Sequence, residues 1–162
     1  MARPPPSRDP LRIDIPGRGR LRLRHLVLDL NGTLAVDGRV PQPVRRRVAR
    51  LAAVLQIRVL TADTFGTAEA EVRGLPVRLE RVSDGRDKER LLRSLGPSAV
   101  AAVGNGANDV AMLRRAALSI AVAGREGMAA ALWTAADVLV WSVEDGLDLL
   151  LEPRRLVATL RR

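Results

Sequence analysis

The chain has 162 residues, of which 47% are apolar and 28% are charged, a balance that predicts one soluble globular domain and excludes disorder of the whole chain. It has no cysteine and no apolar run near the roughly 18 residues of a membrane span, which excludes disulfides, thiolate chemistry, cysteine-ligated zinc and a transmembrane helix. The net charge is +9, but Lys88 is the only lysine among many arginines, a bias typical of GC-rich coding, and two tryptophans and one phenylalanine are too few for a base-stacking surface. We therefore expect a cytoplasmic protein without a membrane partner, for which nucleic acid is not the expected ligand.

The chain begins with a segment that should lie outside the folded domain. Residues 1–10 contain three consecutive prolines and predict a flexible or polyproline-like tail, which leaves residues 11–162 as a single domain. Residues 11–24 alternate apolar and polar positions around the turn dipeptide Pro16-Gly17. This pattern predicts a short hairpin with one buried face.

From residue 25 onward, short apolar runs alternate with helical patterns. The runs predict strands that are buried on both faces, at residues 25–28, 57–60, 99–103, 118–122 and 138–140. The helical patterns cover residues 44–55, 66–73, 87–95, 107–116, 126–132, 145–151 and 153–160. The alternation predicts right-handed βαβ crossovers, and hence an α/β domain with a doubly wound, mainly parallel sheet.

Polar clusters follow three of the predicted strands. They comprise residues 29–34, 61–63 and 104–109, and they contain carboxylates, hydroxyls and glycines. In doubly wound sheets the ligand lies beyond the carboxyl ends of the strands. We therefore expect the three clusters to meet at one edge of the sheet, where a metal ion and a phosphate group can be held.

The first cluster suggests a specific chemistry. Asp29 ends a buried strand and precedes Gly32, whose backbone freedom lets consecutive amides point at one anion. A carboxylate in this setting can attack phosphorus and form an aspartyl phosphate. Because the nucleophile and the phosphate are both negative, the reaction needs cations. A magnesium ion held by Asp29, a nearby backbone carbonyl and Asp109 would supply two charges, Lys88 would supply a third, and Thr61 would donate a hydrogen bond to the phosphate.

The order of these segments resembles the four motifs of the haloacid dehalogenase (HAD) superfamily of phosphatases and phosphotransferases. Within it, residues 61–63 and 104–113 are most similar to segments of the phosphorylation domain of P-type ATPases. The chain as a whole resembles the small soluble P-type-ATPase-like members. The resemblance spans residues 25–140 and implies a Rossmann-like, three-layer α/β/α fold, Mg²⁺ as the cofactor and a phosphoaspartate at Asp29.

The resemblance also implies roles for individual residues. The implied catalytic residues are Asp29, Asn31 and Lys88. The implied substrate ligands are Leu30, Gly32, Thr61, Ala62, Lys88 and Asn108. The implied metal ligands are Asp29, Asn31, Asn105 and Asp109. We expect Asn108 to orient either Lys88 or a metal ligand.

Two positions depart from the pattern of the superfamily. Its phosphatases carry an aspartate two residues after the nucleophile, which protonates the leaving group and later activates water, whereas Asn31 stands there in this chain. The P-type ATPases also lack that aspartate and keep a long-lived phosphoenzyme, so Asn31 predicts slow hydrolysis or substrates with good leaving groups. Asn105 stands where an aspartate is usual, and it predicts weaker metal binding than a site with three carboxylates.

The intervals between the motifs are too short for a lid. Residues 35–60 and 64–87 can hold neither a cap domain nor the nucleotide-binding domain of the ATPases, and ion transport is excluded without transmembrane segments. The open site predicts a large phosphorylated substrate, or a lid supplied by a neighbouring subunit of a homo-oligomer. The alternative to an enzyme is a degenerate phosphate- or magnesium-binding regulatory module that acts through protein or nucleic-acid contacts, with catalysis lost at Asn31 and Asn105.

Three further residues have open interpretations. Asp63 is either a neighbour of the metal site or a cap of the following helix. Trp133 and Trp141 lie on apolar stretches, which predicts that they are in the core or in a contact between subunits.

Overall fold

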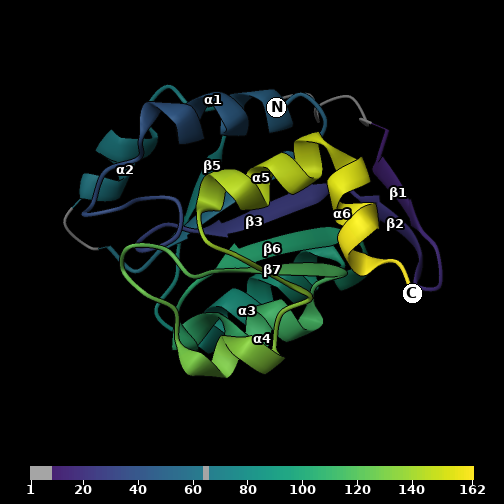
Figure 1. Ribbon diagram of the computed structural model, residues 1–162. Coiled ribbons are helices and arrows are strands. Elements are labelled where there is room, and N and C mark those ends of the chain that lie inside the picture. Colours follow the sequence, from purple (N-terminus) through teal and green to yellow (C-terminus); the bar gives the residue numbers. More distant parts are fainter. Residues whose placement is uncertain (1–8, 64–65) are drawn as a thin grey trace.

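The computed structural model describes residues 9–63 and 66–162, and it consists of a six-stranded sheet between helices and a separate hairpin (Figure 1). The sheet is parallel throughout, in the order β5-β4-β3-β6-β7-β8. Its strands are β3 (His25–Asp29), β4 (Gln56–Thr61), β5 (Arg78–Arg81), β6 (Val100–Gly104), β7 (Leu118–Val122) and β8 (Val138–Val140). This is the predicted Rossmann-like α/β fold, in which central strands such as β6 and β7 are buried on both faces.

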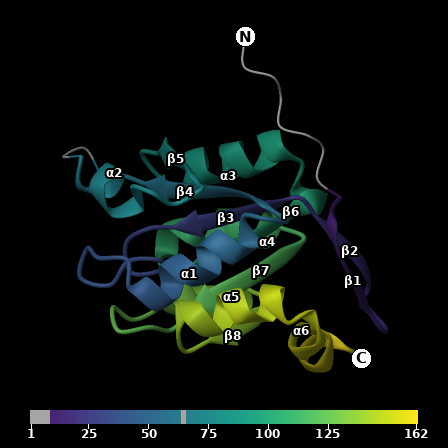
Figure 2. The same cartoon turned by 90° about the horizontal axis from the view of Figure 1, so that it is seen from above.

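Helices cover both faces of the sheet, so the molecule has three layers (Figure 2). One face is covered by α1 (Gln42–Leu51), α2 (Thr67–Val72), α5 (Val143–Leu151) and α6 (Pro153–Leu160). The other face is covered by α3 (Gly85–Leu95), α4 (Val110–Arg115) and the 3-10 helix η3 (Ala130–Thr134). Two short 3-10 helices, η1 (Pro97–Ala99) and η2 (Ala107–Asp109), flank β6.

The helices form where the apolar positions repeat at helical spacing. In α1, Val44, Val48 and Leu51 make one buried stripe against the sheet, and the arginines between them face outward. In α3, the side chain of Asp84 accepts hydrogen bonds from the amides of Arg86 and Asp87 and thereby caps the first turn. None of the helices in the described residues is long and apolar enough to cross a membrane.

The predicted N-terminal hairpin is present as β1 (Leu11–Ile15) and β2 (Gly19–Leu23), which pair antiparallel. Its apolar side chains, including Ile13 and Leu23, belong to the same core as the helices α1, α5 and α6. The amide of Arg162 donates to the carbonyl of Pro16, so the end of the chain is fixed beside the hairpin turn (Figure 1). The hairpin therefore closes the end of the domain opposite the carboxyl ends of the sheet strands.

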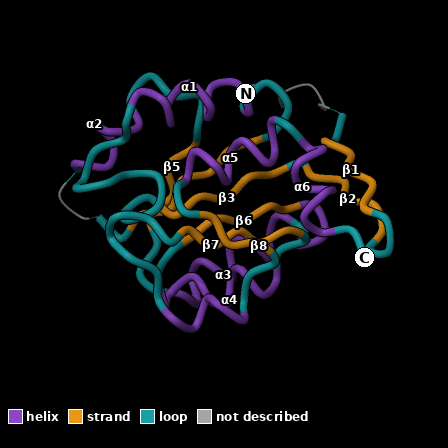
Figure 3. Tube along the Cα trace, viewed as in Figure 1, coloured by secondary structure: helices purple, strands orange, loops and turns teal. Residues whose placement is uncertain are grey.

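Two predictions of secondary structure were wrong. A helix was predicted at 126–132, but the structure has a turn with a bridge between Gly124 and Gly127, followed by η3. Figure 3 distinguishes the helices, strands and loops of the described residues. Gly127 has φ of +79°, a left-handed conformation that a helix does not contain. Strand β5 was not predicted, because it lies at the sheet edge and only alternates in burial. The predicted proline-rich tail falls largely on residues 1–8, outside the described residues.

Candidate active site

The carboxyl ends of β3, β4 and β6 meet at one edge of the sheet, as predicted. Asp29 pairs in register with Leu60, and Leu28 pairs with Val103, so the loops that follow these strands begin at the same level. A cavity of about 170 Å³ opens there. It is lined by Asp29, Asn31, Ala62, Val82, Ser83, Asp84, Lys88, Asn105, Gly106 and Asn108.

Lys88 is the centre of the polar network below this cavity. Its Nζ lies 2.6 Å from Oδ1 of Asp29 and 2.7 Å from Oδ1 of Asp109. It also donates to Oδ1 of Asn108 at 3.3 Å, so of the two roles expected for Asn108, orienting Lys88 or a metal ligand, this contact matches the first. Lys88 is only 2% exposed, so its charge is stabilised by the two carboxylates and not by water. The sole lysine of the chain thus lies beside the predicted nucleophile.

Burial and charge act in opposite directions on these groups. Burial, and after it the neighbouring Asp109 carboxylate, raise the pKa of Asp29 to about 6, although Lys88 and the Thr33 hydroxyl act to lower it. Burial alone would lower the pKa of Lys88, but Asp29 and Asp109 outweigh it and raise that pKa. Lys88 therefore stays positively charged. Asp29 is ionised at neutral pH, but burial makes its ionised form less stable than that of a solvent-exposed carboxyl group.

Asp109 lies behind the cavity and does not line it. It is completely buried, and its Oδ2 accepts hydrogen bonds from the amides of Asn105 at 3.0 Å and Gly106 at 2.9 Å. Because Lys88 occupies its Oδ1, both oxygens already have protein donors. A Cβ at Gly104 would lie 2.5 Å from Oδ2 of Asp109, so only glycine fits where this carboxylate crosses the end of β6. In this arrangement Asp109 positions the loop that carries Asn105.

Thr33 joins the nucleophile to Asn105, a role that the sequence reasoning missed. Its hydroxyl lies 3.3 Å from Oδ2 of Asp29 and 3.1 Å from Oδ1 of Asn105. The Asn105 amide nitrogen donates to the carbonyl of Gly127, so the loop after β7 is attached to the same group. Gly32 makes this packing possible, because it has φ of +77° and a Cβ there would lie 2.5 Å from Asn105 Nδ2. The dipeptide Asn31-Gly32 indicated a turn, but nothing in its pattern indicated that Thr33 would turn inward.

Of the two predicted substrate ligands at the carboxyl end of β4, Ala62 lines the cavity and Thr61 does not. Thr61 is 2% exposed, and its hydroxyl accepts a hydrogen bond from the Asp63 amide at 3.0 Å. The Asp63 carboxylate accepts from the Thr67 hydroxyl and from the Ala68 amide. Of the two interpretations of Asp63, these contacts match the helix cap.

Four lining residues were not among the predicted site residues: Gly106, Val82, Ser83 and Asp84. The last three come from the turn between β5 and α3, and a Cβ on the next residue, Gly85, would lie 2.7 Å from the carbonyl oxygen of Asn108. The turn therefore packs directly on the loop after β6. The sequence does carry a signal for this turn. Asp84 followed three residues later by Asp87 is typical of a helix N-terminus, and it predicts that a helix begins after Asp84.

The oxygen atoms at the cavity suit a hard cation. Within residues 9–63 and 66–162, no group of three or more histidine, cysteine, aspartate or glutamate side chains could hold a metal ion. However, Oδ2 of Asp29 and Oδ1 of Asn105 converge on the same Thr33 hydroxyl, and Asn31 lies beside them on the cavity wall. Mg²⁺ typically takes one or two carboxylates and keeps several waters. The carboxylate of Asp29 with the amide oxygen of Asn105 fits that pattern and contributes only one negative charge.

Comparison of the sequence finds a relative of unassigned activity. No protein-family model matches the chain. The uncharacterized protein MJ0073 of Methanocaldococcus jannaschii is 37% identical over 82 residues, which are 51% of this chain and 88% of the relative. This identity over most of the relative places the two chains in one family.

Comparison of the structure finds phosphatases. A HAD family hydrolase from Streptomyces avermitilis superimposes with a TM-score of 0.64 at 18% identity, over 79% of this chain and 82% of that one. The 3-deoxy-D-manno-octulosonate 8-phosphate phosphatase of Moraxella catarrhalis, solved with magnesium, phosphate and a sugar acid, gives 0.64 at 14% identity, over 86% and 94% of the two chains. At these identities the likeness shows a common fold, and it covers nearly the whole described chain.

Proposed function

We propose that this chain, a member of the haloacid dehalogenase superfamily by its fold, is a magnesium-dependent phosphohydrolase that forms an aspartyl phosphate on Asp29. The observation that carries the proposal is the contact of Lys88 with both Asp29 and Asp109 at the edge of a phosphate-sized cavity. A lysine that is 2% exposed beside a carboxylate with a raised pKa is typical of a reactive site. Phosphatases with the same fold support the proposal at the level of reaction class.

The reaction would proceed by two displacements at phosphorus. A carboxylate oxygen of Asp29 forms a bond to phosphorus while the bond to the leaving-group oxygen breaks and its electron pair departs with the leaving group. Water then attacks the same phosphorus, the bond to Asp29 breaks, and inorganic phosphate and a free carboxylate result. Lys88 neutralises charge on the phosphoryl oxygens in both steps. The amides of Gly32 and Thr33 donate to the carbonyls of Ala35 and Leu30, so they are not free to bind the phosphate as the sequence led us to expect.

Asp29, Asn105 and the carbonyl of Asn31 would hold Mg²⁺. Its two charges would lower the repulsion between the carboxylate and the phosphate. Asp109 would act one layer behind, because it holds the Asn105 loop and Lys88 in place. With a single carboxylate facing the ion, we expect weaker magnesium binding than in sites where aspartate stands in place of Asn105.

Asn31 sets the expected rate. It lines the cavity where a carboxylic acid would otherwise protonate the leaving group and later accept a proton from water. An amide can do neither, so the second displacement should be slow and good leaving groups should react best. This combination, a stable phosphoenzyme without a cap or a membrane domain, is the behaviour we propose for a soluble P-type-ATPase-like hydrolase.

Release of para-nitrophenol from para-nitrophenyl phosphate tests the proposal. Turnover should require magnesium, stop in the presence of a chelator, and disappear in Asp29→Asn. Asp63→Asn is the matched control, since this aspartate caps α2 outside the cavity and its loss should leave turnover in place. If neither this ester nor acetyl phosphate is hydrolysed by the folded wild type, the chain is a phosphate- or magnesium-binding regulatory module instead.

A further inference from the structure

A second and larger cavity lies next to the proposed catalytic site. Its volume is about 400 Å³, against about 170 Å³ for the cavity at Asp29. Ligand pockets for small molecules usually span about 300–1,000 Å³, so the smaller cavity has room for a phosphate group and not for the rest of a substrate. The larger cavity is lined by Gly32, Thr33, Val36, Pro41, Val122, Gly124, Arg125, Trp141, Ser142, Val143 and Glu144.

The two cavities share one wall. Gly32 and Thr33 line the larger cavity, and the Thr33 hydroxyl lies 3.3 Å from Oδ2 of the nucleophile Asp29. The same hydroxyl contacts Asn105, which lines the smaller cavity. Asn105 in turn donates to the carbonyl of Gly127. Gly127 is bridged to Gly124, and Gly124 also lines the larger cavity. A molecule with its phosphate at Asp29 can therefore extend over this wall into the larger cavity.

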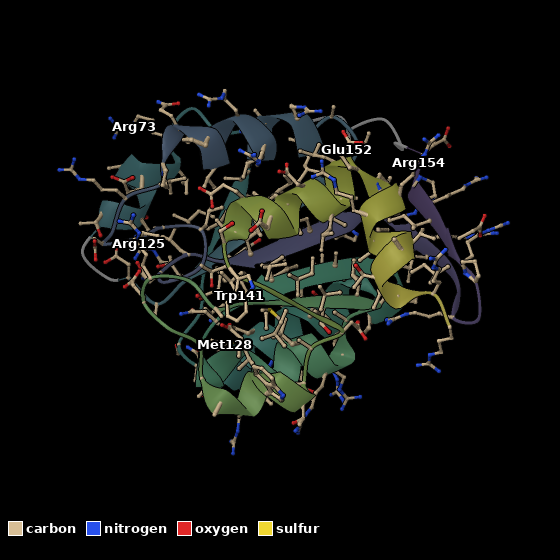
Figure 4. All side chains as sticks on the ribbon, viewed as in Figure 1. Arg73, Arg125, Met128, Trp141, Glu152 and Arg154 are labelled. Atoms are coloured by element: carbon tan, nitrogen blue, oxygen red, sulfur yellow. The ribbon has the colours of Figure 1, made fainter. Side chains whose placement is uncertain are left out.

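Trp141 gives the larger cavity its chemical character. It follows β8 directly and is 76% exposed, so it is not in the core, contrary to one of its two predicted placements. In Figure 4 Trp141 lies below α5, and Arg125 lies to the left of Trp141. An exposed indole at a cavity mouth offers a flat face on which an aromatic ring can stack. Apolar side chains such as Val36 and Val143 continue this surface inward.

Arg125 and Glu144 add hydrogen-bonding groups of both kinds to this surface. Neither side chain forms an ion pair with another residue in the described part of the chain. Arg125 can donate but not accept, and an ionised Glu144 can accept but not donate. A hydrocarbon ring could form a hydrogen bond with neither side chain, whereas a nitrogen heterocycle has acceptors and donors at its edge that can bond with both.

We propose that the larger cavity binds the base of a nucleoside monophosphate whose phosphate is held at Asp29. A nucleotide has the required two-part form, because a sugar separates a dianionic phosphate from a flat ring with donors and acceptors. The assignment rests on the proposed phosphohydrolase function and names its substrate class. Because the leaving group of a nucleoside monophosphate is an alkoxide, the slow turnover expected from Asn31 applies to this substrate. It also accounts for how a chain without a cap domain recognises a leaving group, since recognition comes from the loops after β3, β7 and β8.

Binding can be measured apart from catalysis. Trp133→Phe leaves Trp141 as the sole tryptophan, because the chain has only two. Adenosine, guanosine, cytidine and uridine, which carry no phosphate, should change the fluorescence of Trp141 in a saturable manner, and ribose 5-phosphate should not. The titration is repeated with Asp29→Asn in the same background, where the nucleoside response should persist.

Kinetics supply the second readout. Trp141→Ala should lower kcat/KM for nucleoside 5′-monophosphates relative to acetyl phosphate by about tenfold or more, the range expected for loss of one stacked base. Trp133→Ala is the matched control: this tryptophan is 66% exposed on η3, does not line the cavity, and should leave the ratio unchanged.

The two proposals fail in different ways. If nucleosides change the fluorescence of Trp141 but no phosphate ester is hydrolysed, the cavity assignment stands and the phosphohydrolase proposal falls. If acetyl phosphate is hydrolysed through Asp29 but nucleosides leave the fluorescence unchanged at millimolar concentration, the nucleotide assignment is overturned. An equal loss for nucleotides and acetyl phosphate in Trp141→Ala would also overturn it.

Discussion

At the scale of single residues, the arrangement around Lys88 explains why the site needs a divalent cation. One buried ammonium contacts two carboxylates, Asp29 and Asp109, so the network carries one negative charge before a phosphate enters. A phosphate dianion next to that charge would be repelled. Mg²⁺ at Asp29 and Asn105 would reverse the sign of the site and allow the anion to approach.

The first prediction concerns Asn31. Asn31→Asp places a carboxyl where proton transfer is missing, and general acid–base catalysis typically contributes a factor of about 10² or more. We expect turnover of alkyl phosphates, which have poor leaving groups, to rise by about this factor, and that of acetyl phosphate to rise less. Initial rates with both substrates check this, and Asn31→Ala should show no gain. Equal rates for Asn31→Asp and the wild type on alkyl phosphates would contradict this account of position 31.

The second prediction concerns pH and Asp29. Its pKa is raised from 3.8 to about 6, chiefly by burial, so the folded state holds a proton that the unfolded state has lost between these values. The stability contributed by this carboxyl is therefore present at low pH and lost as pH rises through about 6. Asparagine cannot ionise and avoids that loss.

We therefore expect Asp29→Asn to raise the free energy of unfolding more at about pH 7.5 than at about pH 5, in magnesium-free buffer. Urea denaturation of both proteins at the two pH values is the measurement. Asp87→Asn is the control, and its effect should be the same at both pH values: the hydrogen bond from the Ser83 amide holds the pKa of Asp87 below its ordinary value, so this carboxyl group is ionised throughout that range. A difference between Asp29→Asn and wild type that does not change with pH would contradict the raised pKa.

The sequence predicted which charged residues would meet, but not the hydroxyl that joins them. Asp29 and Asn108 come together because parallel strands end at one edge of the sheet, whereas Lys88 reaches them from the first turn of α3. The inward position of Thr33 depends on the positive φ of Gly32 and on the shape of the loop after it, which the residue pattern does not determine. The same limit applies to Asp109, which was expected to be a metal ligand and is completely buried behind the cavity.

At the scale of elements, the start of α3 controls the position of Lys88, which lies in its first turn. Asp84 caps this turn through hydrogen bonds of 2.8 Å and 3.0 Å from the amides of Arg86 and Asp87. The amide of Lys88 itself donates to the Asp84 carbonyl. A change at the cap should therefore alter both the stability of the helix and the placement of the lysine.

The third prediction tests this cap. Asp84→Ala should lower the free energy of unfolding by about 1 kcal/mol, the usual effect of losing an N-cap side chain, while Asp84→Asn keeps a capping oxygen and should lie close to the wild type. Chemical denaturation of the three proteins separates these cases. If Asp84→Ala unfolded at the wild-type denaturant concentration, the cap would contribute nothing to the fold.

Elements with continuous apolar runs were the easiest to predict. Strands β3, β6 and β7 are buried on both faces, so their sequences carry an unbroken signal. Strand β5 lies at the edge, and the turn at Gly124 and Gly127 replaces a predicted helix. Both departures arise from tertiary contacts, namely the pairing of β5 with β4 and the hydrogen bond from Asn105 to Gly127.

At the scale of the whole molecule, many arginines serve the fold. Arg47 of α1 pairs with Asp148 of α5 at 2.8 Å, and Arg18 of the hairpin turn pairs with Asp137 at 2.9 Å. Arg58 pairs with Glu80 across β4 and β5. These pairs join neighbouring elements and engage some of the arginines within the domain, but the net charge of +9 already counts their carboxylate partners and is unchanged by the pairing.

The fourth prediction follows from this distribution of charge. We expect double-stranded DNA and RNA to bind no tighter than about 10⁻⁶ M at physiological salt, the range of nonspecific electrostatic binding. Fluorescence anisotropy with labelled duplexes at low and physiological salt is the measurement. Nanomolar binding that persists at physiological salt would contradict the prediction and would favour a nucleic-acid-binding role.

The central claim is that Asp29 becomes phosphorylated, and trapping that species tests it most directly. The protein is incubated with radiolabelled acetyl phosphate and magnesium, quenched in acid, and digested to locate the label. We expect an acid-stable, hydroxylamine-labile phosphate on the peptide that contains Asp29, dependent on magnesium and absent from Asp29→Asn. No label on the folded wild type, or equal labelling of Asp29→Asn, would contradict the account.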